Sequence, residues 1–206
     1  MPAAALHTDA WVLAKRPPAE SFQSHALFSA EHGLLPVFVR VPKSGASKRA
    51  VLDLFTEAAV DLESSNQGRT WFLREARVLR TAEGIGRSYD ALQAASSLAA
   101  LIARNPPPPE GAAKIAELLR GAFAAFGASP HPAVILFKSV FRFARDEGYP
   151  VAQEWLPSLP AELRAEAERL LRTPAAELTD PAAASLPALQ RRLEEYLKGR
   201  TDILVD

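Results

Sequence analysis

The hydrophobic pattern of this chain changes from a period of two to a helical period near Gly84, and this change limits the folds open to it. Before Gly84, short apolar segments alternate with polar residues, as half-buried strands do. After it, Ala- and Leu-rich segments repeat with the period of amphipathic helices. The pattern predicts an α+β protein in which strands come first and helices follow.

Five strand-like segments precede Gly84. The clearest has apolar residues at alternate positions from Leu52 to Leu62, with acidic residues on the opposite face. The expected strands lie around Trp11–Leu13 and over 22–29, 34–40, 52–63 and 70–79. So many strands in about 75 residues predict a small barrel, for which the five-stranded OB-fold is the leading candidate and a generic five-stranded sheet the alternative.

Helical segments follow, separated by prolines and glycines that end helices. The expected helices cover 88–103, 111–126, 132–147, 160–172 and 185–198. We therefore expect two domains, an OB-fold nucleic-acid-binding domain over 1–82 and a helical bundle domain over 83–206. Gly84-Ile85-Gly86 is interpreted as a hinge between them, because the third glycine of a dinucleotide-binding fingerprint is absent.

Charge is distributed unevenly along the chain although the formal net charge is zero. Residues 1–145 hold 17 Lys and Arg against 12 Asp and Glu, whereas residues 146–206 hold 7 against 12. The first part is thus +5 and the second −5. Such an asymmetry favours an anionic partner for the first part, although ordinary solvated faces would give the same count.

Basic residues gather in two places in the strand-rich part, and both are candidates for DNA binding through phosphate contacts. The loop from Arg40 to Arg49 contains no acidic residue, and a second group is opposed in sequence only by Glu75. Five aromatic residues interleave with these groups and could include base-stacking platforms or belong to the core. The candidate DNA-binding residues are Arg40, Lys43, Lys48, Arg49, Arg69 and Arg74, with Arg77 and Arg80 nearby; the aromatics are Trp11, Phe22, Phe38, Trp71 and Phe72.

A second candidate site lies on the helix expected over 132–147. Lys138, Arg142 and Arg145 share one stripe at 100° per residue, and Phe141 flanks it. A charged face with an exposed phenylalanine could accept a peptide that ends in an apolar residue and a carboxylate. The alternative is that Phe141 packs beneath a neighbouring helix.

Signals for an enzyme, a metal site or a membrane segment are weak. The chain has no cysteine, its four histidines are scattered, and it has no phosphate-binding loop. No apolar run approaches the ~18 residues of a membrane span. We expect a protein that is not an enzyme, needs no cofactor, binds no metal and does not contact membranes, with the cytoplasm as its location.

An ordered series of short motifs resembles the N-terminal domain of the RecO family of bacterial DNA-repair proteins. The motifs are Glu20-Ser21, Glu31-His32-Gly33, the basic loop 40–49, Leu54-Phe55 and Leu73-Arg74-Glu75-Ala76. Residues 137–149, which end in Gly148-Tyr149, resemble a helix of that family, and residues 189–197 resemble its terminal helix. The resemblance implies an OB-fold followed by a helical bundle.

The RecO resemblance also implies a function. It implies a recombination mediator, associated with the nucleoid, that binds single- and double-stranded DNA and anneals complementary strands. It further implies RecR and the acidic C-terminal tail of single-stranded-DNA-binding protein as partners, so that the recombinase can load. The tail would meet Lys138, Arg142 and Arg145. The alternative is a degenerate relative that serves as a protein-interaction scaffold without strong DNA binding.

Two features depart from the RecO pattern. Many relatives carry a cysteine cluster directly after the Gly-Tyr helix, and here residues 149–156 run on without one. That region must then be held by the packing of Trp155 and Leu156. Relatives are also often more basic than this chain.

Overall fold

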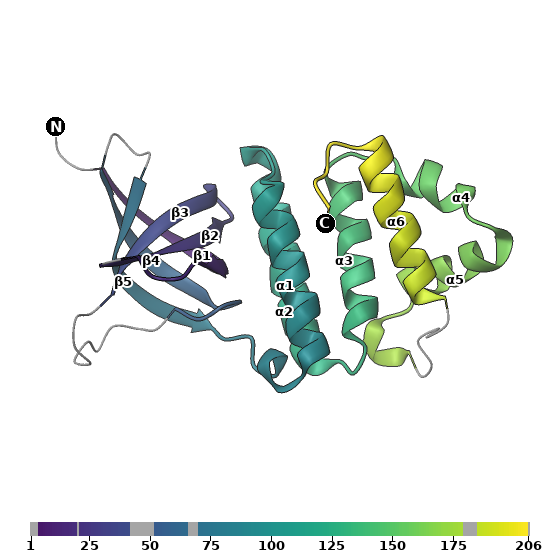
Figure 1. Cartoon of the computed structure of the whole chain (residues 1–206), viewed down its shortest axis with the longest axis horizontal. Coiled ribbons are helices and arrows are strands. Elements are labelled where there is room, and N and C mark those ends of the chain that lie inside the picture. Colours follow the sequence, from purple (N-terminus) through teal and green to yellow (C-terminus); the bar gives the residue numbers. More distant parts are fainter. Residues whose placement is uncertain (1–3, 20, 42–51, 66–69, 179–184, 206) are drawn as a thin grey trace. The chain divides into compact units, whose positions relative to one another are not determined.

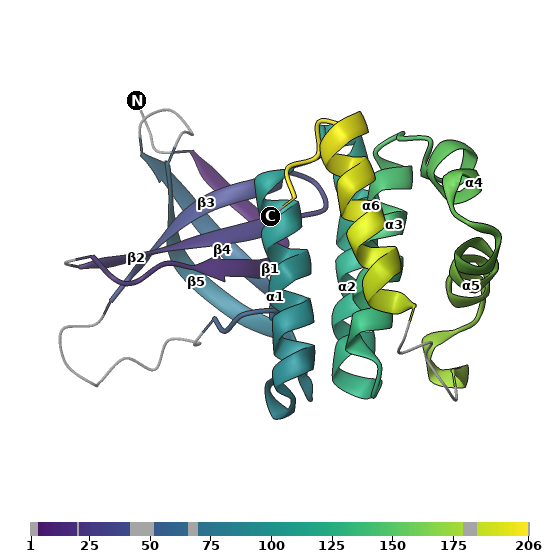
Figure 2. The ribbon, with the colours of Figure 1, turned by 45° about the vertical axis from the view of Figure 1, so that its right-hand side comes forward.

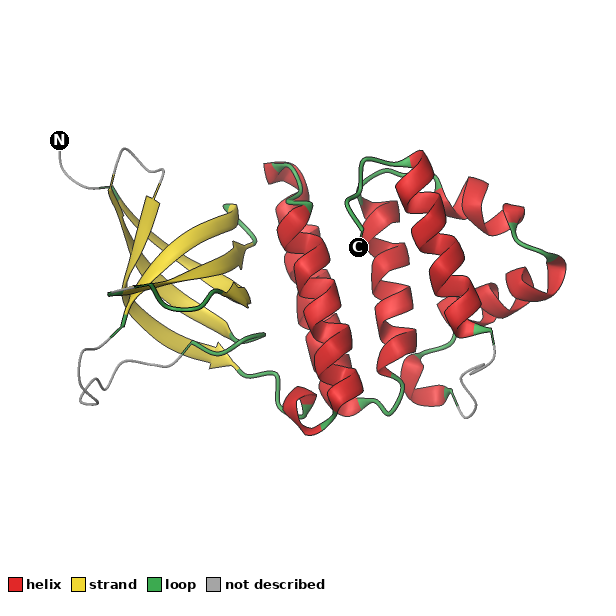
Figure 3. Cartoon of the chain, in the orientation of Figure 1, coloured by secondary structure: helices red, strands yellow, loops and turns green. Residues whose placement is uncertain are grey.

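Five strands followed by helices make up this protein, as the computed structural model shows (Figures 1 and 3). It describes residues 4–19, 21–41, 52–65, 70–178 and 185–205. The α+β class expected from the change in period is confirmed. The strands are β1 (Ala5–Lys15), β2 (Phe22–Ser29), β3 (Gly33–Arg40), β4 (Glu57–Ser65) and β5 (Thr70–Arg80).

The sheet closes on itself because β1 and β4, the strands at the two ends of its order, pair with each other (Figure 2). The strand order is β1-β2-β3-β5-β4, and β1 runs antiparallel to both β2 and β4, which makes a closed barrel. The β3–β5 pair is parallel and, within the described part of the sheet, the shortest, joining Val37 to Trp71 and Phe38 to Phe72.

Alternation along each strand decides which residues fill the barrel. Val12, Leu27, Val37, Val60 and Leu62 are all buried in one apolar cluster. Because successive side chains of a strand point to opposite faces, the residues between them point to the outer face of the barrel. The fold thereby sets which aromatic residues are core and which are surface.

Strand β4 starts later than expected. The alternation from Leu52 onward predicted a strand over 52–63, but β4 begins at Glu57. Phe55 has a φ of 62°, which breaks an extended strand, and its amide donates to the carbonyl of Val12 at 2.8 Å. Leu54 is consequently exposed instead of belonging to the inner face.

The helices lie close to the expected ranges. They are α1 (Tyr89–Arg104), α2 (Ala112–Ala128), α3 (Pro132–Asp146), α4 (Leu156–Ser158), α5 (Ala161–Arg172) and α6 (Leu186–Arg200), with short turns η1 (Ile85–Arg87), η2 (Pro109–Gly111), η3 (Val151–Trp155) and η4 (Ala175–Glu177). Among the described residues, no helix is long and apolar enough to cross a membrane.

The chain divides into two compact units. One contains residues 1–82 and 106–119, and the other contains residues 83–105 and 120–206. The first unit thus combines the strands with residues 106–119, which belong to the helical part of the sequence. We call the second unit the helical unit.

Helix α3 is the centre of the helical unit. It packs against α1, α5, α6 and η3. A helix covered on several sides must be apolar on several sides, and Val134, Ile135, Phe137 and Phe143 are accordingly buried.

The Gly84 segment is closely packed, unlike the open linker that a hinge suggests. Gly84 has a φ of 94°. A Cβ atom built on it would lie 2.3 Å from the carbonyl oxygen of Gly127, and one on Gly127 would lie 2.1 Å from the carbonyl oxygen of Glu83. Two backbone segments therefore touch where no side chain fits.

His25 is a buried titratable residue of the barrel. It lies on β2 opposite Lys15 of β1 and Val37 of β3. Its Nε2 atom is 3.2 Å from Gln23 Oε1, and among the described atoms its Nδ1 has no hydrogen-bond partner. Burial, and to a smaller extent the charge of Lys15, lower the pKa of His25 to about 4.

This lowered pKa predicts a barrel that weakens in mild acid. The unfolded chain binds a proton at His25 near pH 6.5, whereas the folded chain resists it until about pH 4. Stability should therefore fall as the pH drops through this window, by roughly 3 kcal/mol in total. Urea unfolding at a series of pH values measures the loss. His25→Gln should make the free energy of unfolding less dependent on pH, whereas His32→Gln, at an exposed histidine, should leave this dependence unchanged. An unchanged pH dependence in His25→Gln would contradict its attribution to His25.

Candidate nucleic-acid interface

Three phenylalanines from three strands form a cluster on the outer face of the barrel. Phe22 is on β2, Phe38 on β3 and Phe72 on β5. The ring centroids of Phe22 and Phe72 are 5.4 Å apart in an edge-to-face arrangement, and those of Phe38 and Phe72 are 5.8 Å apart. Phe22 is 36% exposed, and the other two are half-buried. We call these three residues the aromatic platform.

Strand alternation explains why the platform faces outward. Val37 belongs to the barrel core, and Val39, Trp71 and Leu73 pack against it. Phe38 and Phe72 lie between these residues and so point to the other face. Both rings are partly exposed on that face, and aromatic side chains on a protein surface are the groups on which unpaired bases stack.

Arg40 lies beside the platform. It is directly opposite Phe22 in the β2–β3 pair and is exposed. Cβ atoms of residues opposite each other in an antiparallel pair are about 4.5 to 5.5 Å apart. The guanidinium group of Arg40 is thus within reach of a phosphate attached to a base on the platform.

The other two candidate aromatics are part of the core. Trp11 is buried, and Trp71 packs against the inner cluster of the barrel. Trp11 is closed to solvent, whereas Trp71 is half-buried and lies on the inner side of the sheet. Of the five aromatics singled out in the sequence, the structure brings only Phe22, Phe38 and Phe72 together on the surface.

Acidic residues of β4 offset part of the second basic group. Arg74 forms an ion pair with Glu63, and Arg80 Nη1 lies 2.7 Å from Glu57 Oε2. In sequence this group is opposed only by Glu75, and the pairing of β4 with β5 supplies the two further carboxylates. Arg74 is therefore less available to DNA than expected, whereas exposed Arg77 lies opposite the small side chain of Ala59.

The remaining candidate DNA-binding residues fall outside the described part of the chain. They are Lys43, Lys48, Arg49 and Arg69. Residues 42–51 join β3 to the segment before β4, and residues 66–69 join β4 to β5. Of the basic residues in the loop 40–49, Arg40 is the one in the described part of the chain.

The basic stripe of α3 is engaged within the helical unit. Lys138 Nζ donates to the carbonyl oxygen of Thr173 at 2.7 Å, at the end of α5, and burial lowers the pKa of this amine. Arg142 Nε donates to Asp146 Oδ2 at 3.3 Å, and Arg145 Nη2 donates to Asp146 Oδ1 at 2.8 Å. Asp146 thus offsets charge that the peptide hypothesis requires.

Phe141 is buried, so the exposed apolar surface expected beside the stripe is absent at this residue. It is 7% exposed and packs against Trp155 in a tilted arrangement, with ring centroids 5.9 Å apart. Phe137 lies on the same indole at 6.1 Å. Phe141 therefore packs beneath a neighbouring element. Of the two residues expected to hold the region after Tyr149, Trp155 is buried and Leu156 is half-buried.

The described residues contain no group of three or more His, Cys, Asp or Glu side chains that could hold a metal ion. No protein-family model matches the chain, and no curated protein matches it significantly. A function for this chain must therefore be argued from its own residues.

Proposed function

We propose that the barrel binds single-stranded nucleic acid across the aromatic platform, with Arg40 and the basic residues that follow it contacting phosphates. The observation that carries this proposal is the platform itself, which combines three partly accessible rings with an adjacent exposed arginine. Stacking on aromatic side chains is tolerant of sequence because every base has a π-face.

We further propose that the barrel is an OB-fold. Its closure and the order β1-β2-β3-β5-β4 support this, as does the position of the platform on β2 and β3, where OB-folds bind oligonucleotides. With the RecO resemblance, the proposal becomes a DNA repair and recombination mediator that anneals complementary strands. RecR and the acidic tail of single-stranded-DNA-binding protein remain its proposed partners.

A scaffold without strong DNA binding is the second candidate. The ion pairs Arg74–Glu63 and Arg80–Glu57 favour it, because they lower the positive potential of the outer β5 surface. The two candidates differ in whether the chain binds oligonucleotides at all.

Fluorescence anisotropy with a labelled oligodeoxythymidine tests the proposal. The double variant Phe38→Leu/Phe72→Leu keeps apolar volume but removes both rings, and should bind at least about tenfold more weakly, since a stacked base contributes ~1–3 kcal/mol. The slope of log Kd against log salt should stay unchanged. Arg40→Ala should instead reduce that slope by about one.

Tyr89→Leu is the matched control, because Tyr89 is a highly exposed aromatic outside the barrel. It should bind like the parent chain. Undiminished affinity in the double phenylalanine variant would refute the platform, and no binding even at low salt would favour the scaffold.

A further inference from the structure

A short segment after α6 lies in extended form on the helical unit. We call residues 201–205 the strap (Figure 1, yellow). The Asp202 amide donates to the Tyr149 hydroxyl at 3.2 Å, and the Ile203 amide donates to Thr201 Oγ1 at 3.1 Å. The first of these bonds ties the strap to Tyr149, and the second lies within the strap.

Asn105 clamps the backbone of the strap at Leu204. The Leu204 amide donates to Asn105 Oδ1 at 2.7 Å, and Asn105 Nδ2 donates to the Leu204 carbonyl at 3.0 Å. Asn105 Nδ2 also donates to the Leu101 carbonyl at 2.7 Å, which fixes the amide at the end of α1. A carboxamide carries the same donor and acceptor as a peptide group. The side chain of Asn105 therefore makes the same pair of hydrogen bonds to Leu204 that the backbone of a neighbouring antiparallel strand would make.

The side chains of the strap alternate, as those of an extended peptide do. Ile203 is 6% exposed, Leu204 is 61% exposed, and Val205 faces a cavity. Asn105 contacts only the backbone of Leu204, so it does not discriminate between side chains at that position. Specificity for particular side chains must come from the two flanking positions.

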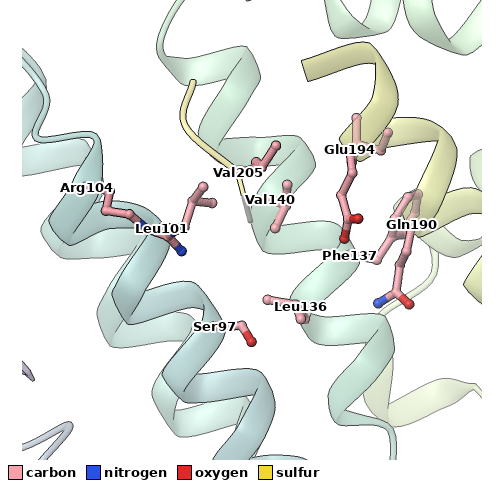
Figure 4. A pocket seen from close by; sticks show the side chains of 10 residues that line it. Ser97, Leu101, Arg104, Leu136, Phe137, Val140, Gln190, Glu194 and Val205 are labelled. Atoms are coloured by element: carbon pink, nitrogen blue, oxygen red, sulfur yellow. The ribbon is translucent and has the colours of Figure 1, made fainter. Parts of the chain in front are cut away.

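The cavity beside Val205 has a mainly apolar lining and is partly open to solvent (Figure 4). Its volume is about 140 Å³. Leu101, Leu136, Phe137 and Val140 supply apolar lining, and the polar lining residues are Ser97, Arg104, Gln190 and Glu194. Val205 forms one wall without filling the space, so a larger apolar side chain at this position has room.

We propose that Asn105 and this cavity form a binding site for an extended peptide with branched apolar residues at alternate positions, and that the strap occupies it as an internal competitor. The occupant is a segment of a partner protein whose pattern is that of Ile203-Leu204-Val205. It would displace the strap, place its backbone on Asn105 and set the second apolar side chain in the cavity. This site is in the helical unit and is independent of the aromatic platform.

Tethering explains why the site would be closed in the parent chain. A segment joined by a short linker acts at an effective concentration on the order of millimolar. A free peptide with the same contacts must exceed that concentration to bind. Releasing the strap should therefore expose an affinity that the intact chain hides.

A labelled peptide Thr-Asp-Ile-Leu-Val is the probe, measured by fluorescence anisotropy. Ile203→Asp places a charge in a buried position and should release the strap, so this variant should bind the peptide at least tenfold more tightly than the parent chain. Adding Asn105→Ala should abolish that gain. Leu204→Asp is the matched control, because its side chain is exposed; it should behave like the parent chain. A peptide with Leu in place of Val should bind more tightly.

Equal peptide binding by Ile203→Asp and the parent chain would overturn the proposal, as would binding that survives Asn105→Ala. Circular dichroism establishes that each variant is folded. Should Ile203→Asp unfold, Leu204→Pro serves the same purpose, because proline lacks the amide hydrogen that Asn105 accepts. The same gain of peptide binding is then required of Leu204→Pro.

Discussion

Replacing Trp155 by alanine should lower the free energy of unfolding by about 3 to 5 kcal/mol, the range of a buried tryptophan truncation. Trp155 is among the largest fully buried side chains, and its indole lies against both Phe137 and Phe141 of α3. It is also the last residue of the π-helical turn η3, so its loss removes the contact that holds this turn on α3. Urea denaturation followed by circular dichroism measures the change.

Trp155→Phe is the control for this prediction and should cost much less. Among the described atoms, the indole Nε1 of Trp155 is buried without a hydrogen-bond partner. Phenylalanine retains a ring against α3 and removes that unsatisfied donor, whose burial is itself costly. A loss below about 1 kcal/mol in Trp155→Ala would show that neighbouring side chains collapse into the space and that η3 does not depend on the indole.

Gly127→Ala should destabilise the helical unit by about 3 kcal/mol or more. The new Cβ atom would lie 2.1 Å from the carbonyl oxygen of Glu83, and that atom belongs to the backbone. A flexible side chain could move away, but here a backbone segment must shift, and overpacking of this kind commonly costs about 1 to 3 kcal/mol or more. Thermal unfolding of the variant checks the prediction.

Gly121→Ala provides a control of opposite sign on the same helix. Gly121 is exposed, and nothing lies within 4 Å of the position that a methyl group would take there. Alanine favours the interior of a helix over glycine by about 1 kcal/mol. Gly121→Ala should therefore raise the melting temperature while Gly127→Ala lowers it. A rise in both variants would mean that the Glu83–Gly127 approach is not a close contact in solution.

The sequence was sufficient to predict the element types because these depend on local periodicity. The five expected helices agree with α1, α2, α3, α5 and α6 to within two residues or so at each end. The early part of β4 was wrongly predicted, since the alternation through Leu54 continues across a residue, Phe55, whose backbone is not extended. The alternation of apolar and polar residues indicates which side chains share a face, but it does not indicate the backbone φ of each residue.

The composition of the candidate sites could not be predicted in the same way, because it depends on register between strands. Nothing local distinguishes Phe72 from Trp71, yet one faces outward and the other packs on the core. The Arg74–Glu63 pair likewise requires knowledge that β4 and β5 are neighbours. On α3, charge and phenylalanine share a stripe, but the helix is covered on several sides and Phe141 is buried.

Asn105 was missed because its partner is Leu204, almost at the other end of the sequence. In the sequence it is only the residue before four prolines, where a helix has to end. A single asparagine that binds backbone leaves no periodic or compositional signal. Such a residue can be found only once the chain is folded.

The short pairing between β3 and β5 has a consequence for how the barrel opens. Among the described residues, these strands are joined at Val37–Trp71 and Phe38–Phe72, whereas every other pair of strands has a longer register there. Local opening, and with it the exchange of amide hydrogens for deuterium, should begin at this seam. Two rings of the aromatic platform lie across it. A nucleic-acid strand that stacks on both rings would hold β3 and β5 together. Slower amide exchange in β3 and β5 would then report binding without any label on the nucleic acid.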